Sequence, residues 1–100
     1  MNTRTQDQEY LKCLSVLYVE DDEDIREQFS QFLSRLTGSV ITAHNGAEGL
    51  EAYRKHNPDI IITDILMPTM NGLDMVKEIR TIDKSLPVII LTAFEELDYL

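Results

Sequence analysis

Residues 60–72 read IIITDILMPTMNG and decide the fold class of this chain. Three consecutive isoleucines are too apolar for a strand with one face in water, and they are typical of a strand covered on both faces, as in a parallel sheet. Asp64 follows this apolar run, and Asn71-Gly72 opens a segment with helical spacing. The stretch therefore predicts a buried parallel strand that ends at an acidic residue and leads into a helix.

Three further apolar runs predict strands at residues 14–19, 40–43 and 88–92, in addition to the strand at 60–63. The run at 88–91 has the same continuous apolar character, so we expect this strand to be covered on both faces as well. The alternation of strands with helical segments predicts an α/β domain with a doubly wound parallel sheet, because short right-handed crossovers place helices on both faces.

The helices are predicted from apolar residues that recur on one helical face. The first helix begins at Asp24 and is expected to end at Gly38 in a left-handed cap; its apolar face consists of Ile25, Phe29, Phe32, Leu33 and Leu36. The second helix is closed by Asn57-Pro58, and its apolar face consists of Ala47, Leu50 and Tyr53. The third begins at Asn71-Gly72 with Leu73, Val76 and Ile79, and a fourth is expected from Glu95.

Length and composition exclude several classes of protein. One hundred residues allow one small domain, and 43% hydrophobic residues suffice for a core. A net charge of -9 provides no basic patch, so we expect no direct nucleic-acid binding. No apolar run approaches the ~20 residues of a membrane span, and residues 1–13 lack the apolar core of a secretory signal, so we expect a cytoplasmic protein without membrane contact. The one cysteine, Cys13, has no partner for an internal disulfide.

Acidic residues gather where the strands of this sheet should end. Glu20 and Asp21 follow the first strand, and Asp64 follows the third. In parallel α/β sheets, ligands bind outside the carboxyl ends of the strands. If these two strands are neighbours, the three carboxylates repel one another by roughly 4 kcal/mol per pair at 4 Å and an effective dielectric of 20. A divalent cation such as Mg²⁺ offsets this repulsion, whereas helix capping explains only the acids at 22–24.

The motifs of this chain resemble those of a known family. They are Val19-Glu20-Asp21-Asp22 after the first strand, Asp64-x-x-Met67-Pro68-x-Met70-Asn71-Gly72 after the third, and Thr92-Ala93 after the fourth. Together they resemble the CheY-like receiver domain of two-component response regulators. The resemblance implies a flavodoxin-like sheet with strand order 2-1-3-4-5.

The resemblance also implies a role for each site residue. Asp64 would accept a phosphoryl group from a histidine kinase or a phosphotransfer protein. Asp21, Asp64 and the backbone carbonyl of Leu66 would hold Mg²⁺, and Glu20 would act largely through its waters. Thr92 would hydrogen-bond a phosphoryl oxygen when the domain switches conformation.

Family members place a lysine and an aromatic switch residue on or after a fifth strand. Neither Lys77 nor Lys84 has the right position to replace that lysine. We therefore interpret residues 1–13 as an N-terminal extension and residues 14–100 as a receiver domain that lacks the fifth strand and the last helix. Residues 87–92 should then form an apolar sheet edge, so we expect residues 1–100 to form a homodimer through that edge or through an exchanged C-terminal helix.

Two other functions remain open from the residues alone. One is a pseudo-receiver that binds partners without phosphorylation. The other is a Mg²⁺-dependent phosphatase with an aspartyl-phosphate intermediate, but haloacid-dehalogenase-like phosphatases carry a second aspartate where this chain has Leu66. We therefore expect no enzymatic turnover of a separate substrate. His44 and His56 are interpreted as surface or helix-end residues, and Met67, Met70 and Met75 as packing residues.

Overall fold

The structure is a computed structural model that describes residues 8–65, 67 and 69–91. Its elements, in chain order, are β1 (Ser15–Val19), α2 (Glu23–Leu36), β2 (Ser39–Ala43), α3 (Gly46–His56), β3 (Ile60–Asp64), α4 (Gly72–Arg80) and β4 (Val88–Leu91). Residues 8–11 form one helical turn ahead of β1. The seven elements confirm the predicted alternation of strands and helices.

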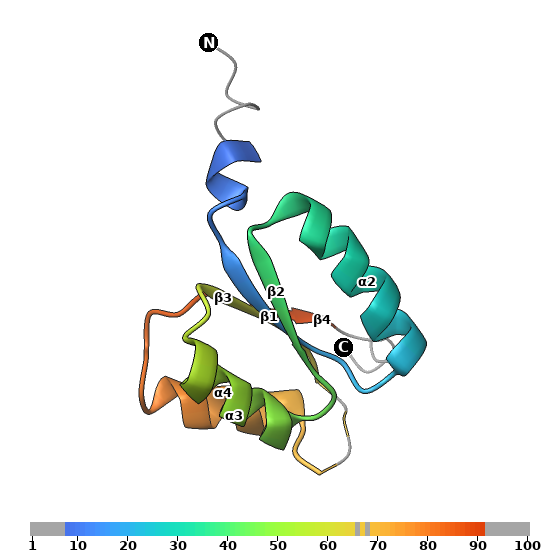
Figure 1. Cartoon of the computed structure of the whole chain (residues 1–100). Coiled ribbons are helices and arrows are strands. Elements are labelled where there is room, and N and C mark those ends of the chain that lie inside the picture. The colour runs from blue at the N-terminus through green and yellow to red at the C-terminus, as the bar shows by residue number, and fades with distance from the viewer. Residues whose placement is uncertain (1–7, 66, 68, 92–100) are drawn as a thin grey trace.

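The four strands form one parallel sheet in the order β2-β1-β3-β4 (Figure 1). β1 lies in the middle and pairs Val19 with Ala43 of β2 on one side and with Thr63 of β3 on the other. Because all strands are parallel, their carboxyl ends meet at one edge of the sheet. This order confirms the flavodoxin-like fold without a fifth strand in the described residues.

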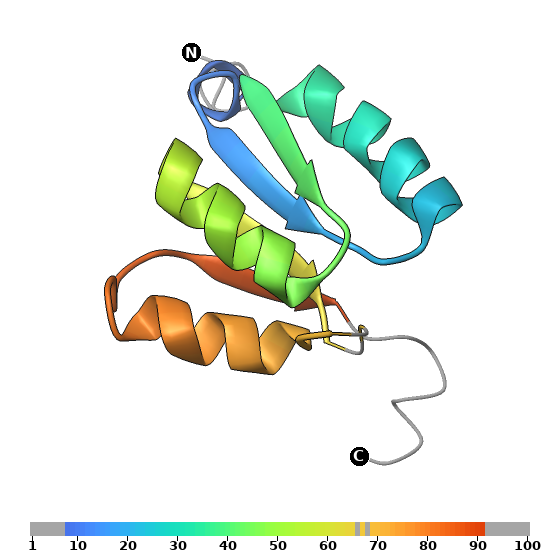
Figure 2. The same ribbon diagram turned by 60° about the horizontal axis from the view of Figure 1, so that its bottom comes forward.

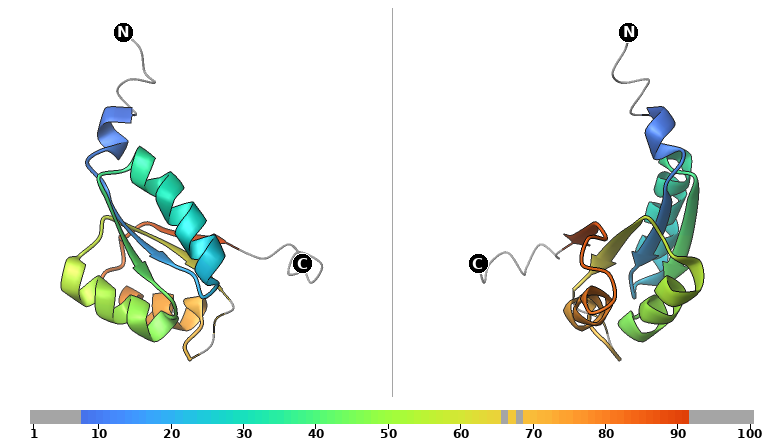
Figure 3. Two further views of the ribbon diagram at one scale, coloured as in Figure 1. Left: turned by 45° about the vertical axis from the view of Figure 1, so that its right-hand side comes forward. Right: turned by 90° about the vertical axis from the view of Figure 1, so that its left-hand side faces the viewer.

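Helices cover both faces of the sheet (Figures 2 and 3). On one face, α3 and α4 pack over a cluster of buried residues; its members are Leu17, Val19, Ala43, Leu50, Tyr53, Ile61, Met75, Ile79 and Leu86. On the other face, α2 packs over a smaller buried cluster of Val16, Tyr18, Leu33 and Ile62. Met67 and Met70 pack against the first cluster, which confirms the prediction that these methionines and Met75 serve packing.

Side-chain caps fix where the helices begin. Asp22, Asn45 and Asn71 each accept a hydrogen bond from the backbone N–H three residues on, at 3.0, 2.7 and 2.9 Å. Such caps satisfy N–H groups that have no partner within the helix. The predicted end of the second helix is also confirmed, because Asn57 caps α3 in the left-handed conformation with φ 52° and Pro58 follows it.

The predicted left-handed cap at Gly38 is wrong. α2 ends at Leu36, its cap Thr37 is extended, and no glycine in the described part of the chain has a positive φ. Gly38 is instead required by a close approach, because a β-carbon there would collide with the carbonyl oxygen of Lys12. Its backbone N–H donates to the carbonyl of Leu14 at 2.9 Å.

The predicted apolar face of α2 is only partly buried. Leu33 is buried and Phe29 partly buried, whereas Ile25, Phe32 and Leu36 are exposed, Ile25 by 52%. The reason is that α2 packs on β1 and β2, and no second helix flanks it among the described residues (Figure 3). β4 also differs from its prediction: Ile89, on the α2 face, is 46% exposed, and Ile90, on the opposite face, is 40% exposed.

α4 is rotated relative to its predicted face. Met75 and Ile79 are fully buried, whereas Leu73 is 43% exposed. The rotation follows from the start of the helix, where Gly72 lies so close to Asp64 that a β-carbon would collide with the Asp64 carbonyl oxygen. Close contact at Gly72 therefore turns Met75 toward the sheet.

Three predictions lie wholly or partly outside the described residues. They are the fourth helix from Glu95, the end of the last strand at Thr92, and the division of the chain at residue 13, which stays a prediction. No helix in residues 8–65, 67 and 69–91 is both long enough and apolar enough to cross a membrane.

Candidate phosphoryl and metal site

Three carboxylates meet at the carboxyl edge of the sheet. β1 ends at Val19 and is followed by Glu20 and Asp21, while β3 ends at Asp64. Because β1 and β3 are neighbours in the sheet, one ligand oxygen from each of these acids lies within 4.8 Å of the others. The structure thus brings together Glu20, Asp21 and Asp64, the acids that the sequence places at these strand ends.

Asp64 is held by its own backbone surroundings. Its side chain is half-buried, and Oδ1 accepts a hydrogen bond from the backbone N–H of Ile65 at 2.7 Å. The hydroxyl of Thr63 donates to the Asp64 carbonyl at 2.8 Å, and Gly72 packs against the same carbonyl. The backbone of Asp64 is therefore held in place, and its carboxylate faces the acids that follow β1.

Glu20 is the buried member of the cluster, with 7% of its surface exposed. Its Oε2 accepts a hydrogen bond from the backbone N–H of Asp22 at 3.1 Å, and its own N–H donates to the carbonyl of Ala43 at 3.0 Å. Burial, together with a hydrogen bond to Asp21 and the negative charges of Asp64 and Asp21, raises the pKa of Glu20 to about 7. In the absence of a cation, Glu20 therefore binds its proton up to a higher pH than an ordinary glutamate does.

The donor set fits a hard divalent cation. Carboxylate oxygens are the ligands that Mg²⁺ prefers, and Mg²⁺ keeps several of its waters when it binds. Asp21 is exposed and Asp64 half-buried, so solvent reaches the cluster from one side, while Glu20 lies buried beneath them. This arrangement leaves room for waters or for a phosphoryl oxygen.

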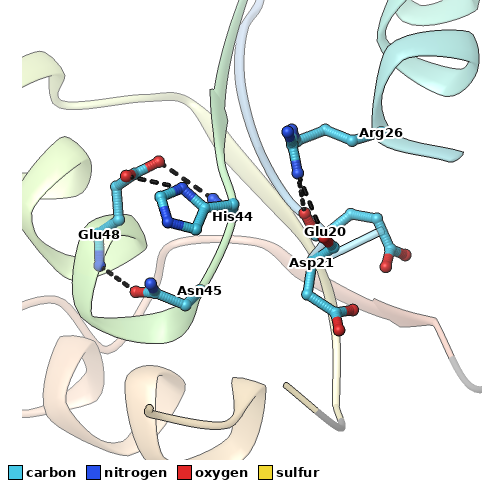
Figure 4. Close-up of polar contacts among 6 residues, drawn as sticks. All are labelled: Glu20, Asp21, Arg26, His44, Asn45 and Glu48. Carbon is cyan, nitrogen blue, oxygen red and sulfur yellow. Dashed lines mark hydrogen bonds and ion pairs between the residues drawn. The ribbon is translucent and has the colours of Figure 1, made fainter. Parts of the chain in front are cut away.

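A further residue at this edge, Arg26, was missed by the sequence analysis. From the first turns of α2 its Nη1 donates to the carbonyl oxygen of Glu20 at 2.9 Å and lies 3.5 Å from that of Asp21 (Figure 4). The sequence did contain a signal, because the dipole of a helix disfavours a positive charge near its N-terminus. An arginine there gains from an acceptor such as these carbonyl oxygens.

Two predicted site atoms, the carbonyl of Leu66 and the hydroxyl of Thr92, lie outside the described residues. His44 and His56 lie at the end of β2 and of α3 and are both exposed, as expected. Nδ1 of His44 lies 2.8 Å from Oε2 of Glu48, whose Oε1 accepts a hydrogen bond from the His44 backbone N–H at 3.0 Å (Figure 4). This pair links β2 to the start of α3.

A four-stranded parallel sheet with three carboxylates at the ends of β1 and β3 defines a class of small α/β domains that can hold a cation at this edge. Within that class, the family described as response regulator receiver domain matches residues 16–100. The chain belongs to this family.

Known proteins similar to this chain agree with that assignment. The response regulator MprA of Mycobacterium avium is 35% identical over 80 residues, which are 80% of this chain and 35% of MprA. The DNA-binding transcriptional regulator NtrC of Escherichia coli is 42% identical over 83 residues, which are 83% of this chain and 18% of NtrC. The chain thus spans about a third or less of the length of these relatives.

A solved structure shares both fold and sequence with the chain. The response regulator protein TrrA of Thermotoga maritima, in complex with Mg(2+)-BeF, matches with a TM-score of 0.78 and 35% identity. The match covers 86% of this chain and 75% of TrrA.

Proposed function

We propose that this domain is the phosphoacceptor of a two-component response regulator, with Asp64 as the residue that is phosphorylated. The observation that carries the proposal is the convergence of Glu20, Asp21 and Asp64 within 4.8 Å in a chain of the receiver family. The similarity to TrrA, whose structure holds Mg(2+)-BeF, supports a cation at this position.

In the proposed reaction, a carboxylate oxygen of Asp64 attacks the phosphorus of a phosphohistidine on a histidine kinase or phosphotransfer protein. An oxygen–phosphorus bond forms, the nitrogen–phosphorus bond breaks, and the electron pair stays on the imidazole of the partner. Mg²⁺, when bound, offsets the negative charge of the phosphoryl oxygens. Asp21, Asp64 and the carbonyl of Leu66 would hold the cation.

The remaining residues prepare the site. Burial and the neighbouring carboxylates raise the pKa of Glu20 to about 7, and a bound cation would favour its charged form, which would contact the waters of the cation. Thr92 would hydrogen-bond a phosphoryl oxygen and thereby couple phosphorylation to a change of conformation. We propose that the domain acts in the cytoplasm as a switch whose phosphorylation changes which proteins it binds. In this proposal it does not turn over a separate substrate.

The experiment that tests this function is phosphorylation by a small phosphodonor with and without Mg²⁺. We expect intact-mass analysis to show one added phosphoryl group that requires Mg²⁺ and is absent from Asp64→Asn. Asp24→Asn is the matched control, because Asp24 is an exposed acid in α2 outside the cluster and should be phosphorylated like the parent. Equal labelling of Asp64→Asn and the parent would refute the proposed acceptor.

A further inference from the structure

Arg26 connects α2 to the backbone of the loop that carries two of the three acids. Its guanidinium donates to the carbonyl of Glu20 at 2.9 Å and lies 3.5 Å from that of Asp21 (Figure 4). A charged donor strengthens a hydrogen bond to a carbonyl, and the planar guanidinium can serve two acceptors at once. The hydrogen bond from Nη1 thus holds the Glu20 carbonyl, and the same nitrogen makes a longer contact with the next carbonyl, that of Asp21.

The helix that carries Arg26 is itself anchored to the sheet. Phe29, one turn further along α2, packs edge to face on Tyr18 of β1, with ring centroids 5.0 Å apart and an interplanar angle of 62°. Asp22 caps the helix by accepting a hydrogen bond from Ile25 N–H at 3.0 Å. The position from which Arg26 reaches the loop is therefore set by contacts on either side of it.

The loop is consequently held at several points around Asp21. Glu20 donates its N–H to Ala43 and accepts a hydrogen bond from the Asp22 N–H, while Arg26 holds the Glu20 carbonyl. With the carbonyls of Glu20 and Asp21 both facing Arg26, the backbone between them has little freedom to rotate. The backbone from which the exposed carboxylate of Asp21 projects is thus held in place.

Arg26 also places a positive charge next to the acid cluster. Burial and the negative charges of Glu20 and Asp64 raise the pKa of Tyr18 to about 12, while Arg26 acts in the opposite direction. The guanidinium of Arg26 therefore acts on the same tyrosine as the carboxylates of Glu20 and Asp64. Its charge faces the backbone of the loop that carries Glu20 and Asp21.

We propose that Arg26 is a positioning residue for the metal site: by holding the carbonyls of Glu20 and Asp21, it aligns their carboxylates with Asp64 and so determines the affinity for Mg²⁺. This inference rests on the proposed function of the acid cluster. Residues that orient metal ligands through hydrogen bonds typically change metal affinity by about 10- to 100-fold when they are replaced.

The test is calorimetric titration of Mg²⁺ alone into the parent protein and into Arg26→Met, with no phosphodonor present. We expect the dissociation constant of Arg26→Met to rise by about 10-fold or more. Arg26→Lys, which keeps the charge and can still donate to a carbonyl, should recover part of the loss. Arg35→Met is the matched control, because it removes an exposed arginine from the last turn of the same helix and should stay within about 2-fold of the parent.

Each outcome decides a separate question. If the parent binds Mg²⁺ and Arg26→Met binds it equally well, the role of Arg26 is wrong while the proposed function stands. If the parent binds no Mg²⁺, both fail. Should Arg26→Met not fold, Arg26→Lys decides the matter, because it is expected to bind several-fold more weakly than the parent, and equal binding would overturn the inference.

Discussion

The two faces of the sheet are covered to different extents. The face under α3 and α4 holds nine buried residues in one cluster, whereas the face under α2 holds four, among the residues that the structure describes. Large exposed hydrophobic residues are correspondingly frequent on α2 and β4; they include Ile25, Phe32, Leu36, Ile89 and Ile90. Burial of apolar surface is the main stabilising contribution, so the α3 and α4 layer should dominate the stability of the fold.

The candidate site draws on both layers. Asp64 leads into α4 and is fixed by backbone contacts at Gly72, in the densely packed layer. Glu20 and Asp21 lead into α2 and are fixed by Arg26, in the thinner layer. The proposed acceptor should therefore be anchored by the fold itself, whereas the placement of the acids proposed to bind the metal depends on a few specific contacts.

The largest effect is expected from a cavity in the dense layer. Leu17 is fully buried in the cluster under α3 and α4, so Leu17→Ala should lower the free energy of unfolding by about 3 kcal/mol. Phe32→Ala, on the exposed face of α2, should cost less than about 1 kcal/mol. Urea unfolding of the two variants measures the contrast, and equal losses would mean that both layers are packed alike.

The second effect concerns two glycines at close contacts: Gly72, the first residue of α4, and Gly49 of α3, which packs against Met75 of α4. Gly72→Ala should destabilise the fold by about 2 kcal/mol, because the β-carbon meets the Asp64 backbone, which cannot move aside without shifting β3. At Gly49→Ala the added β-carbon meets Sδ of the buried Met75 at 2.6 Å and Cγ2 of Val19 at 3.0 Å; these are side-chain atoms, which give way more readily than backbone, and alanine favours the helix by roughly 0.5–1 kcal/mol. Gly49→Ala should therefore have a higher thermal unfolding midpoint than Gly72→Ala. A lower midpoint for Gly49→Ala would contradict the close approach of Gly72 to Asp64.

The third effect is a dependence of stability on pH at the α2 end of the site. The pKa of Glu20 rises from 4.5 to about 7 on folding, so the native state binds more protons than the unfolded state between these values. The stabilising contribution of the protonated group is thus present below pH 4.5 and is lost as pH rises through about 7. The free energy of unfolding, measured by urea in Mg²⁺-free buffer, should fall over this pH range in the parent but not in Glu20→Gln. If it depends on pH in the same way in both proteins, the raised pKa of Glu20 is refuted.

The smallest effect on stability is expected at β4, which is an edge strand of the sheet formed by the described residues. Ile89→Lys should change the free energy of unfolding by less than about 0.5 kcal/mol, because its side chain is 46% exposed. A polypeptide of residues 1–100 should nevertheless associate less, since a charge on an edge strand opposes pairing with another chain. Sedimentation over a range of concentrations measures this, and a parent polypeptide that stays monomeric throughout would exclude association through β4.

Much of the fold could be predicted from the sequence because its signals are local. Continuous apolar runs indicated the parallel strands, and Asn71 and Asn57 marked where α4 begins and α3 ends. The meeting of Asp21 with Asp64 was also predictable, because both follow strands that are neighbours in such a sheet. The strands and the helix ends depend on local residues and periodicity alone, whereas the strand order that makes β1 and β3 neighbours was implied by the resemblance to the receiver family.

The features that were missed depend on tertiary contacts. The burial of Met75 in place of Leu73 follows from the close approach of Gly72 to Asp64, which no helical periodicity reveals. Gly38 serves a contact with the segment before β1 rather than a cap. The role of Arg26 depends on which carbonyls its guanidinium reaches, and the sequence provides only the unusual charge near a helix N-terminus.

The most direct test of the central claim is the binding of beryllofluoride, a phosphoryl mimic, followed by ¹⁹F NMR. We expect bound ¹⁹F signals from the parent protein only when Mg²⁺ is present, and none from Asp64→Asn under the same conditions. This result would mean that the acids after β1 and the acceptor after β3 act as one site. Bound signals that persist without Mg²⁺ or in Asp64→Asn would contradict the account.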